Sequence, residues 1–252
     1  MDIIYQLPFP TEICSKIFMF ACKSPYTGLG VAMLKNRLNV KNLIIPEKDE
    51  DVNIIALYKI TNYPENIYID LYFYTCFKNL TVINLGTTGV TGDIIHLKSL
   101  PKLKKIYFTH TEIYGDIVHL KSLPNLTEIL LAETEIFGDI AELKSLTKLT
   151  EVDLSYTMVT GDIVSLNSLT NLTTIDLSFN NEIYGDIAEL KSLANLTAIN
   201  LHETGVIGNF VHLKSLKKLS MIEFEDTGVT GDENAFHEYR ESTMLNNCHL
   251  YL

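Results

Sequence analysis

The sequence predicts an α/β solenoid, in which a short repeat stacks into a curved parallel sheet with helical or 3-10 segments on the convex side. Glycines recur at steps of 23, 23, 23, 24, 23 and 23 residues from Gly92 to Gly231, and the same aliphatic positions accompany each of them. Both ends of the chain depart from this pattern. A repeat of this length buries its apolar face only against its neighbours. The 252 residues are therefore expected to form stacked repeats between two caps.

The repeat has the frame LxxLxLxxTxIxGDIxxLKSLxx, which residues 126–148 follow. The alternating aliphatic positions predict a short strand with one buried face, and strands that return in the same direction pair in parallel. The Thr after each strand, and Asn181 in the 24-residue repeat, are expected to turn the chain with a side-chain hydrogen bond. The glycine permits the tight convex corner. The Asp after it is suited to cap the helical segment.

This frame resembles the leucine-rich repeat family, in its 23–24-residue class with an IxGxI segment, which is well known from plants and algae. The resemblance covers about residues 67–232. It implies that the strand residues outside the aliphatic positions face a concave surface, where such proteins bind a partner.

Because both ends depart from the repeat, the sequence predicts three regions. Residues 1–41 are expected to form a helical N-terminal cap, residues 42–232 two degenerate and seven regular repeats, and residues 233–252 a C-terminal cap. We expect the strands of the two degenerate repeats at 42–45 and 57–61. The C-terminal cap is predicted as a helix over 233–244 and a closing strand over 248–252.

The text FPTEICSKIFMF at 9–20 resembles the opening of an F-box, whose usual text is LPxEIxxKIFxF. The resemblance implies that a Skp1-type adaptor would contact Pro10, Glu12, Ile13, Ile17 and Phe18. The later part of the motif is missing, and the chain has no Trp. The alternative is a helical cap that covers the repeat core.

The predicted concave positions vary while the frame stays fixed, and they are rich in acids and aromatic rings. Exposed aromatics ringed by charge suit a protein-binding hot spot, and repelling acids favour a basic partner. The same rule of alternation also points Ala132, Ser155 and Ser178 outward. The predicted partner-binding residues are Tyr107, Glu128, Leu130, Glu151, Asp153, Tyr156, Asp176, Phe179, His202, Glu223 and Glu225.

Composition excludes other classes of function. The net charge of −11 argues against binding to nucleic acid or to an anionic membrane surface. The sequence has no catalytic motif, so we expect no enzyme activity, cofactor or metal. The start lacks a signal peptide and the four cysteines form no CxxC pair, which predicts a cytoplasmic protein with reduced thiols. We expect a monomer.

We therefore expect a protein–protein interaction module whose partner is a protein or peptide with a basic patch. Two alternatives stay open. One is an F-box-like substrate receptor of a ubiquitin ligase, and the other is a surface or secreted recognition protein.

Overall fold

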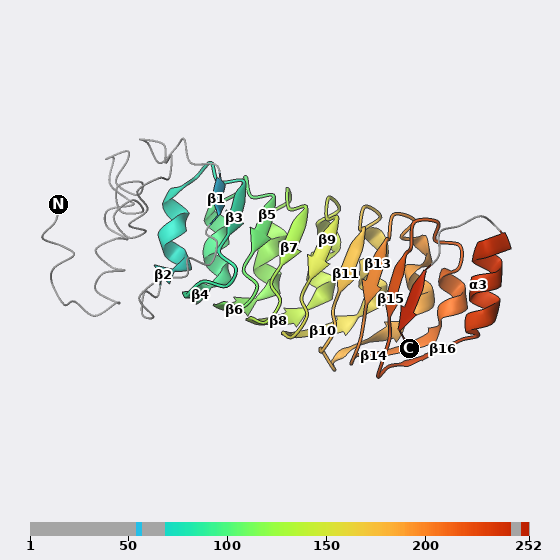
Figure 1. Ribbon diagram of the computed structural model, residues 1–252. Helices are drawn as coiled ribbons and strands as arrows, with labels where there is room; N and C mark the ends of the chain where they lie inside the picture. The colour runs from blue at the N-terminus through green and yellow to red at the C-terminus, as the bar shows by residue number, and fades with distance from the viewer. Residues whose placement is uncertain (1–53, 57–68, 243–247, 252) are drawn as a thin grey trace, which may run out of the picture.

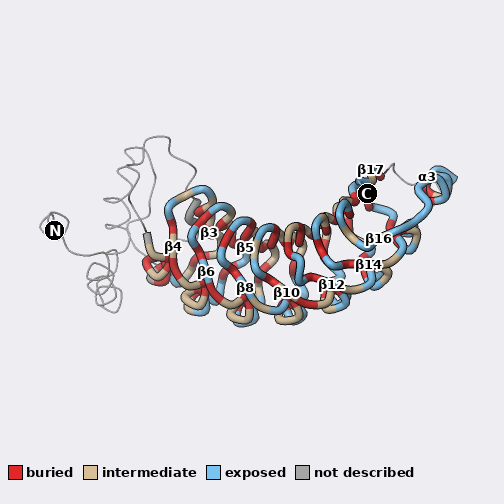
Figure 2. Tube along the Cα trace, turned by 90° about the horizontal axis from the view of Figure 1, so that it is seen from below, coloured by how far each residue is buried: buried red, intermediate tan, exposed pale blue. Residues whose placement is uncertain are grey.

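The computed structural model describes residues 54–56, 69–242 and 248–251, which form an elongated stack of coils (Figure 1). Its described part contains a nine-stranded and an eight-stranded parallel sheet. The coils follow an arc with the nine-stranded sheet on the inner, concave side (Figure 2). This is the predicted α/β solenoid. No helix among the described residues is long and apolar enough to cross a membrane.

The concave sheet forms because each three-residue strand from β3 to β15 buries its central aliphatic side chain and leaves the two flanking residues facing out. Ile106, Ile129 and Val152 are the buried central residues of three successive strands. They pair across the sheet and lie 23 residues apart in sequence. Burial of such a side chain contributes about 1.5–3 kcal/mol. The concave strands, in sheet order, are β1 (Ile54–Ala56), β3 (Val82–Asn84), β5 (Lys105–Tyr107), β7 (Glu128–Leu130), β9 (Glu151–Asp153), β11 (Thr174–Asp176), β13 (Ala198–Asn200), β15 (Met221–Glu223) and β17 (His249–Tyr251).

The second sheet is a finding that the sequence analysis did not anticipate. It lies along the flank of the arc (Figure 2) and contains all or part of the IxGD segment of each described repeat, which we expected to be a corner. Its described strands, in chain order, are β2 (Ile69–Asp70), β4 (Val90–Asp93), β6 (Glu112–Asp116), β8 (Glu135–Asp139), β10 (Met158–Asp162), β12 (Ile183–Asp186), β14 (Gly205–Asn209) and β16 (Gly228–Thr230).

Short 3-10 helices cover the convex side, and each begins after an acidic or amide cap. The carboxylate of Asp139, for example, accepts a hydrogen bond from the amide of Ala141 at 2.8 Å. The predicted N-cap role of the repeated Asp is therefore confirmed, with Asn209 taking this place in the last 3-10 helix. These helices are η2 (Leu71–Cys76), η3 (Ile94–Ser99), η4 (Ile117–Ser122), η5 (Ile140–Ser145), η6 (Ile163–Ser168), η7 (Ile187–Ser192) and η8 (Phe210–Leu213).

The residue that turns the chain in the 24-residue repeat is Asn180, so the prediction of Asn181 was wrong. Asn180 is buried, and its side-chain amide donates to the carbonyl oxygens of Leu154 and Leu177 at 2.8 and 2.9 Å. In the other repeats a Thr donates to the carbonyl three residues before it, as Thr134 does to Leu131. Asn181 is exposed. The extra residue therefore follows the turn.

The first described strand also differs from its predicted position. β1 spans Ile54–Ala56 and pairs with β3, whereas the expected strand at 57–61 lies outside the described residues. Ile54 precedes the capping Asp70 by 16 residues, but the equivalent Val82 precedes Asp93 by only 11. This repeat is therefore five residues longer than the frame. The strand expected at 42–45, the N-terminal cap and the F-box-like residues Pro10, Glu12, Ile13, Ile17 and Phe18 also lie outside the described residues.

The C-terminal end of the core is covered by helix α3 (Glu233–Ser242) and strand β17. Phe236 is buried against Phe210, with ring centroids 5.6 Å apart. The buried guanidinium of Arg240 donates to the carbonyl oxygens of Leu216 and Leu219 at 3.0 and 2.6 Å. Arg240 thus supplies donors to backbone carbonyls of the last repeat, which has no further repeat packed against it.

Candidate protein-binding surface

All eleven predicted partner-binding residues lie on the concave strands or on the turns directly after them, and none is buried. Ala132, Ser155 and Ser178 are buried instead, which corrects their predicted exposure. The alternation of inward and outward side chains holds only within a strand, and these three residues lie beyond the strand ends. The serine hydroxyls donate to the carboxylates of Asp153 and Asp176 at 2.7 and 2.6 Å.

A cation partly neutralises the N-terminal part of this surface. The ammonium group of Lys105 lies 2.6 Å from a carboxylate oxygen of Glu128, and the Tyr107 hydroxyl donates to the other oxygen. Burial and the hydrogen bond to Glu128 raise the pKa of Tyr107. Tyr107 therefore stays protonated and holds Glu128 in place.

The central strands carry acids that repel one another. Glu151 lies opposite Glu128 in the sheet. Burial, followed by the charges of Glu128 and Asp153, raises the pKa of Glu151 above its ordinary value. Burial also raises the pKa of Asp153 above its ordinary value, although hydrogen bonds from Ser155 oppose the shift. Both carboxyls would be more stable as ions beside a cation.

We predict that Glu151→Gln stabilises the protein by about 0.5 kcal/mol at neutral pH, because it removes a like-charged pair across two strands. A raised pKa in the folded state gives stability that is fully present below the ordinary carboxyl pKa and is lost as the pH rises through the raised value. The wild-type protein should therefore become more stable as the pH falls from 7 toward 5. The variant should show a smaller rise in stability over the same range. Chemical denaturation at several pH values measures this. Glu135→Gln, at an exposed site on β8, is the control, and a wild-type-like pH profile for Glu151→Gln would contradict the prediction.

A column of left-handed residues follows the concave strands, one in each repeat. Its members with φ between 50° and 60° are Thr87, His110, Glu133, Tyr156, Phe179, Glu203 and Asp226. This conformation costs a residue with a side chain about 1–2 kcal/mol. The amides of the first six residues bond to the next repeat where the chain turns, as Tyr156 bonds to the Ser178 carbonyl at 3.0 Å. The turn therefore places these side chains side by side along the edge of the concave surface.

Two aromatic rings stack in this column. The rings of Tyr156 and Phe179 have centroids 3.8 Å apart and an angle of 16° between their planes. The His202 ring meets Phe179 edge-on, with centroids 4.7 Å apart. The Tyr156 side chain stays 50% exposed. Burial and the charges of Glu203, Glu133 and Asp176 raise the pKa of its hydroxyl.

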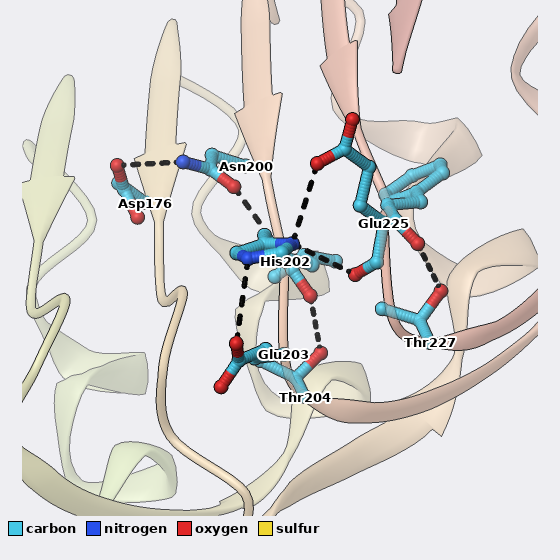
Figure 3. Close-up of polar contacts among 9 residues, drawn as sticks. Asp176, Asn200, His202, Glu203, Thr204, Glu225 and Thr227 are labelled. Atoms are coloured by element: carbon cyan, nitrogen blue, oxygen red, sulfur yellow. Dashed lines mark hydrogen bonds and ion pairs between the residues drawn. The ribbon is translucent and has the colours of Figure 1, made fainter. Parts of the chain in front are cut away.

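His202 is oriented by a polar network at the C-terminal part of the surface (Figure 3). Its Nδ1 lies 3.0 Å from the carbonyl oxygen of Glu225, so Nδ1 must carry a proton. Its Nε2 lies 3.7 Å from the carboxylate of Glu203. Asn200 accepts a hydrogen bond from the His202 amide and donates to the carboxylate of Asp176, both at 3.1 Å. This network links three successive concave strands.

The same region holds the candidate metal ligands within the described part of the chain. One ligand atom from each of His202, Glu203 and Asp226 lies within 4.8 Å of the others. Both carboxylates are exposed. Glu203 and Asp226 are equivalent residues of adjacent repeats, and His202 directly precedes Glu203, whereas no metal site was expected from the sequence.

Sequence reasoning also missed a row of exposed apolar side chains on the second sheet. Tyr114, Phe137, Tyr184 and Ile207 are each between 44% and 56% exposed. Each stands between the aliphatic residue and the glycine of its IxG segment. The variation of this position from repeat to repeat is the sequence feature that could have indicated an exposed site. Its exposure can be predicted only once the segment is recognised as a strand.

Comparison with known proteins agrees with this architecture. Residues 147–192 match the family model for leucine-rich repeats in two copies. The fold is that of a leucine-rich repeat solenoid, and the match to the family model lies within its central repeats. No curated protein sequence matches the chain.

Three solved structures show the same fold. The leucine-rich repeat ectodomain of the membrane receptor kinase GASSHO1/SCHENGEN3 from Arabidopsis thaliana, in complex with Casparian strip integrity factor 2, is 20% identical with a TM-score of 0.66, over 82% of this chain and 26% of that one. The plant peptide hormone receptor RGFR1, in complex with RGF2, is 20% identical with a TM-score of 0.61, over 80% and 37%. An internalin, InlF from Listeria monocytogenes, is 21% identical with a TM-score of 0.56, over 72% and 50%. The matched region is half or less of each of these proteins.

Proposed function

We propose that this protein is a non-catalytic interaction module that binds a basic protein or peptide segment on its concave surface. The observation that supports this proposal is the set of acids on the central strands. These acids repel one another, and a cation would relieve the repulsion. Among the described residues, no lysine or arginine forms an ion pair with Glu151, Asp153 or Asp176. The fold supports the proposal, because leucine-rich repeats generally serve as interaction surfaces and two of the similar structures hold a ligand.

Selection from a random peptide display library tests this function directly. Peptides selected by the wild-type protein should be rich in Lys and Arg, and their affinity should fall as the salt concentration rises. The triple variant Glu151→Gln/Asp153→Asn/Asp176→Asn should bind them at least about tenfold more weakly, since it removes three desolvated charge contacts. The amides keep an acceptor for Ser155 and Ser178, so the turns should persist.

The matched control is Glu112→Gln/Glu135→Gln/Glu189→Gln, which removes the same number of charges from exposed sites away from the concave sheet. It should bind the selected peptides as the wild-type protein does. Selected peptides without net positive charge, or an equal loss of affinity in both triple variants, would refute the proposed function.

A further inference from the structure

The stacked ring of Tyr156 is a second feature of the concave surface, and acids alone do not explain it. An isolated exposed tyrosine has many rotamers, but here Phe179 covers one face of the ring at 3.8 Å and His202 packs on Phe179. Because Tyr156 and Phe179 hold equivalent positions in adjacent repeats, their stack runs along the solenoid. The uncovered face of Tyr156 therefore turns toward the preceding repeat.

Acidic residues lie near this ring, and, besides burial, the charges of Glu133 and Asp176 help to raise the pKa of its hydroxyl. Glu133 is the equivalent residue of the preceding repeat, and its amide bonds to the carbonyl of Ser155 at 3.0 Å. Adjacent parallel strands lie about 4.8 Å apart, so Glu133 and Tyr156 are neighbours along the column. Asp153 ends the strand that leads into Tyr156, and its hydrogen bonds from Ser155 both go to Oδ1. Asp176 lies opposite Asp153 on the next strand.

The cations near this ring are already engaged or lie at a distance along the sheet. Lys105 pairs with Glu128, two strands before the aromatic stack. His110 Nδ1 lies 2.6 Å from a carboxylate oxygen of Glu133, so this side chain is already engaged with an acid. The face of the ring has a negative potential from its quadrupole, and the carboxylates beside it are negatively charged. Both therefore attract a cation.

We propose that the Tyr156 ring, backed by Phe179 and bordered by Glu133 and Asp153, binds the guanidinium group of an arginine in the partner's basic segment. This inference rests on the proposed function and names its central contact. A guanidinium is flat and weakly hydrated, so it stacks on an aromatic ring while its N–H groups bond to carboxylates at its edge. A lysine ammonium is strongly hydrated and lacks the planar fork, so it gains less at this site.

The test uses three synthetic peptides with blocked ends and the same length. Each peptide has four test residues, which alternate with glycine and serine. The test residues are all arginine in the first peptide, all lysine in the second and all citrulline in the third. Calorimetry at low ionic strength should show the arginine peptide binding about fivefold more tightly than the lysine peptide, as one cation–π contact of about 1 kcal/mol predicts. Citrulline keeps the shape of arginine without its charge, and its peptide should not bind measurably.

Tyr156→Leu should remove the preference for arginine over lysine and leave the affinity for the lysine peptide unchanged. Tyr156→Phe should keep the preference, because it retains the ring. Tyr184→Leu is the control, since Tyr184 is equally exposed but lies on the second sheet. Because the Tyr156 ring is not part of the core, the melting temperature of each variant should match that of the wild-type protein.

Two results would overturn this inference. Equal affinities of the arginine and lysine peptides for the wild-type protein would do so, as would a preference that survives in Tyr156→Leu. If both peptides bind equally and the triple acid variant loses both, the inference fails while the proposed function stands. If neither peptide binds, both fail.

Discussion

Replacement of Ile129 by aspartate is expected to lower the free energy of unfolding by more than about 4 kcal/mol and to open the central repeats. Ile129 is fully buried at the centre of β7, between Ile106 on β5 and Val152 on β9. The frame places aliphatic side chains around it, so a carboxylate there would have no partner. The protein must either bury an unpaired charge or separate neighbouring repeats.

The loss should spread along the stack, because each repeat is stabilised mainly by its contacts with adjacent repeats. Thermal unfolding followed by circular dichroism measures the loss of stability, and hydrogen exchange should show reduced protection in the strands on both sides of β7. Leu130→Asp is the control. Leu130 is the next residue and faces the concave side, so its change should cost less than about 1 kcal/mol despite the nearby Asp153. Equal losses in the two variants would contradict the assigned faces of the strand.

The concave sheet could be predicted from sequence because its signal is local and repeated. Each strand has one buried aliphatic residue between two outward residues, and seven copies of the frame show the same spacing. The outward residues of each strand, such as Glu151 and Asp153, follow directly. The rule fails at Ser155 and Ser178, because a left-handed residue follows each of them and the alternation has already ended at the strand.

The second sheet could not be predicted in the same way, because its strands contain residues that are depleted in sheets. Gly and Asp at the end of IxGD favour a turn by propensity. Gly161 instead adopts φ of +119° and keeps the strand β10 paired with its neighbours. The position of the turn amide was ambiguous for another reason. Asn180 and Asn181 are adjacent, and only their burial shows which of them bonds to the backbone.

The relations that define the aromatic site also depend on three-dimensional geometry. Tyr156, Phe179 and His202 could be selected from their places in the frame. The frame does not show that the first two rings stack, or that the Glu225 carbonyl orients His202. These contacts join residues 23 apart in sequence, and they depend on the left-handed turns that bring equivalent side chains together.

Gly161→Ala is expected to destabilise the protein by about 3 kcal/mol, through backbone strain and the loss of a helix cap together. A side chain at φ of +119° is strained wherever it points. A Cβ on Gly161 would also lie 2.3 Å from the Oδ1 of Asp139, which caps the 3-10 helix of the preceding repeat. The glycine is therefore required both for its own backbone conformation and for the cap of its neighbour.

Gly86→Ala is the matched control, since its nearest atom would be the Thr109 carbonyl oxygen at an ordinary 3.4 Å. It should change the stability by less than about 1 kcal/mol. A double-mutant cycle separates the two causes of the loss at Gly161. Asp139→Ala alone should cost about 1 kcal/mol, the usual value of a cap. Combined with Gly161→Ala it should cost less than the sum of the two single changes, because the alanine then meets no carboxylate. Full additivity would mean that backbone strain alone requires the glycine and that its contact with the preceding cap contributes nothing.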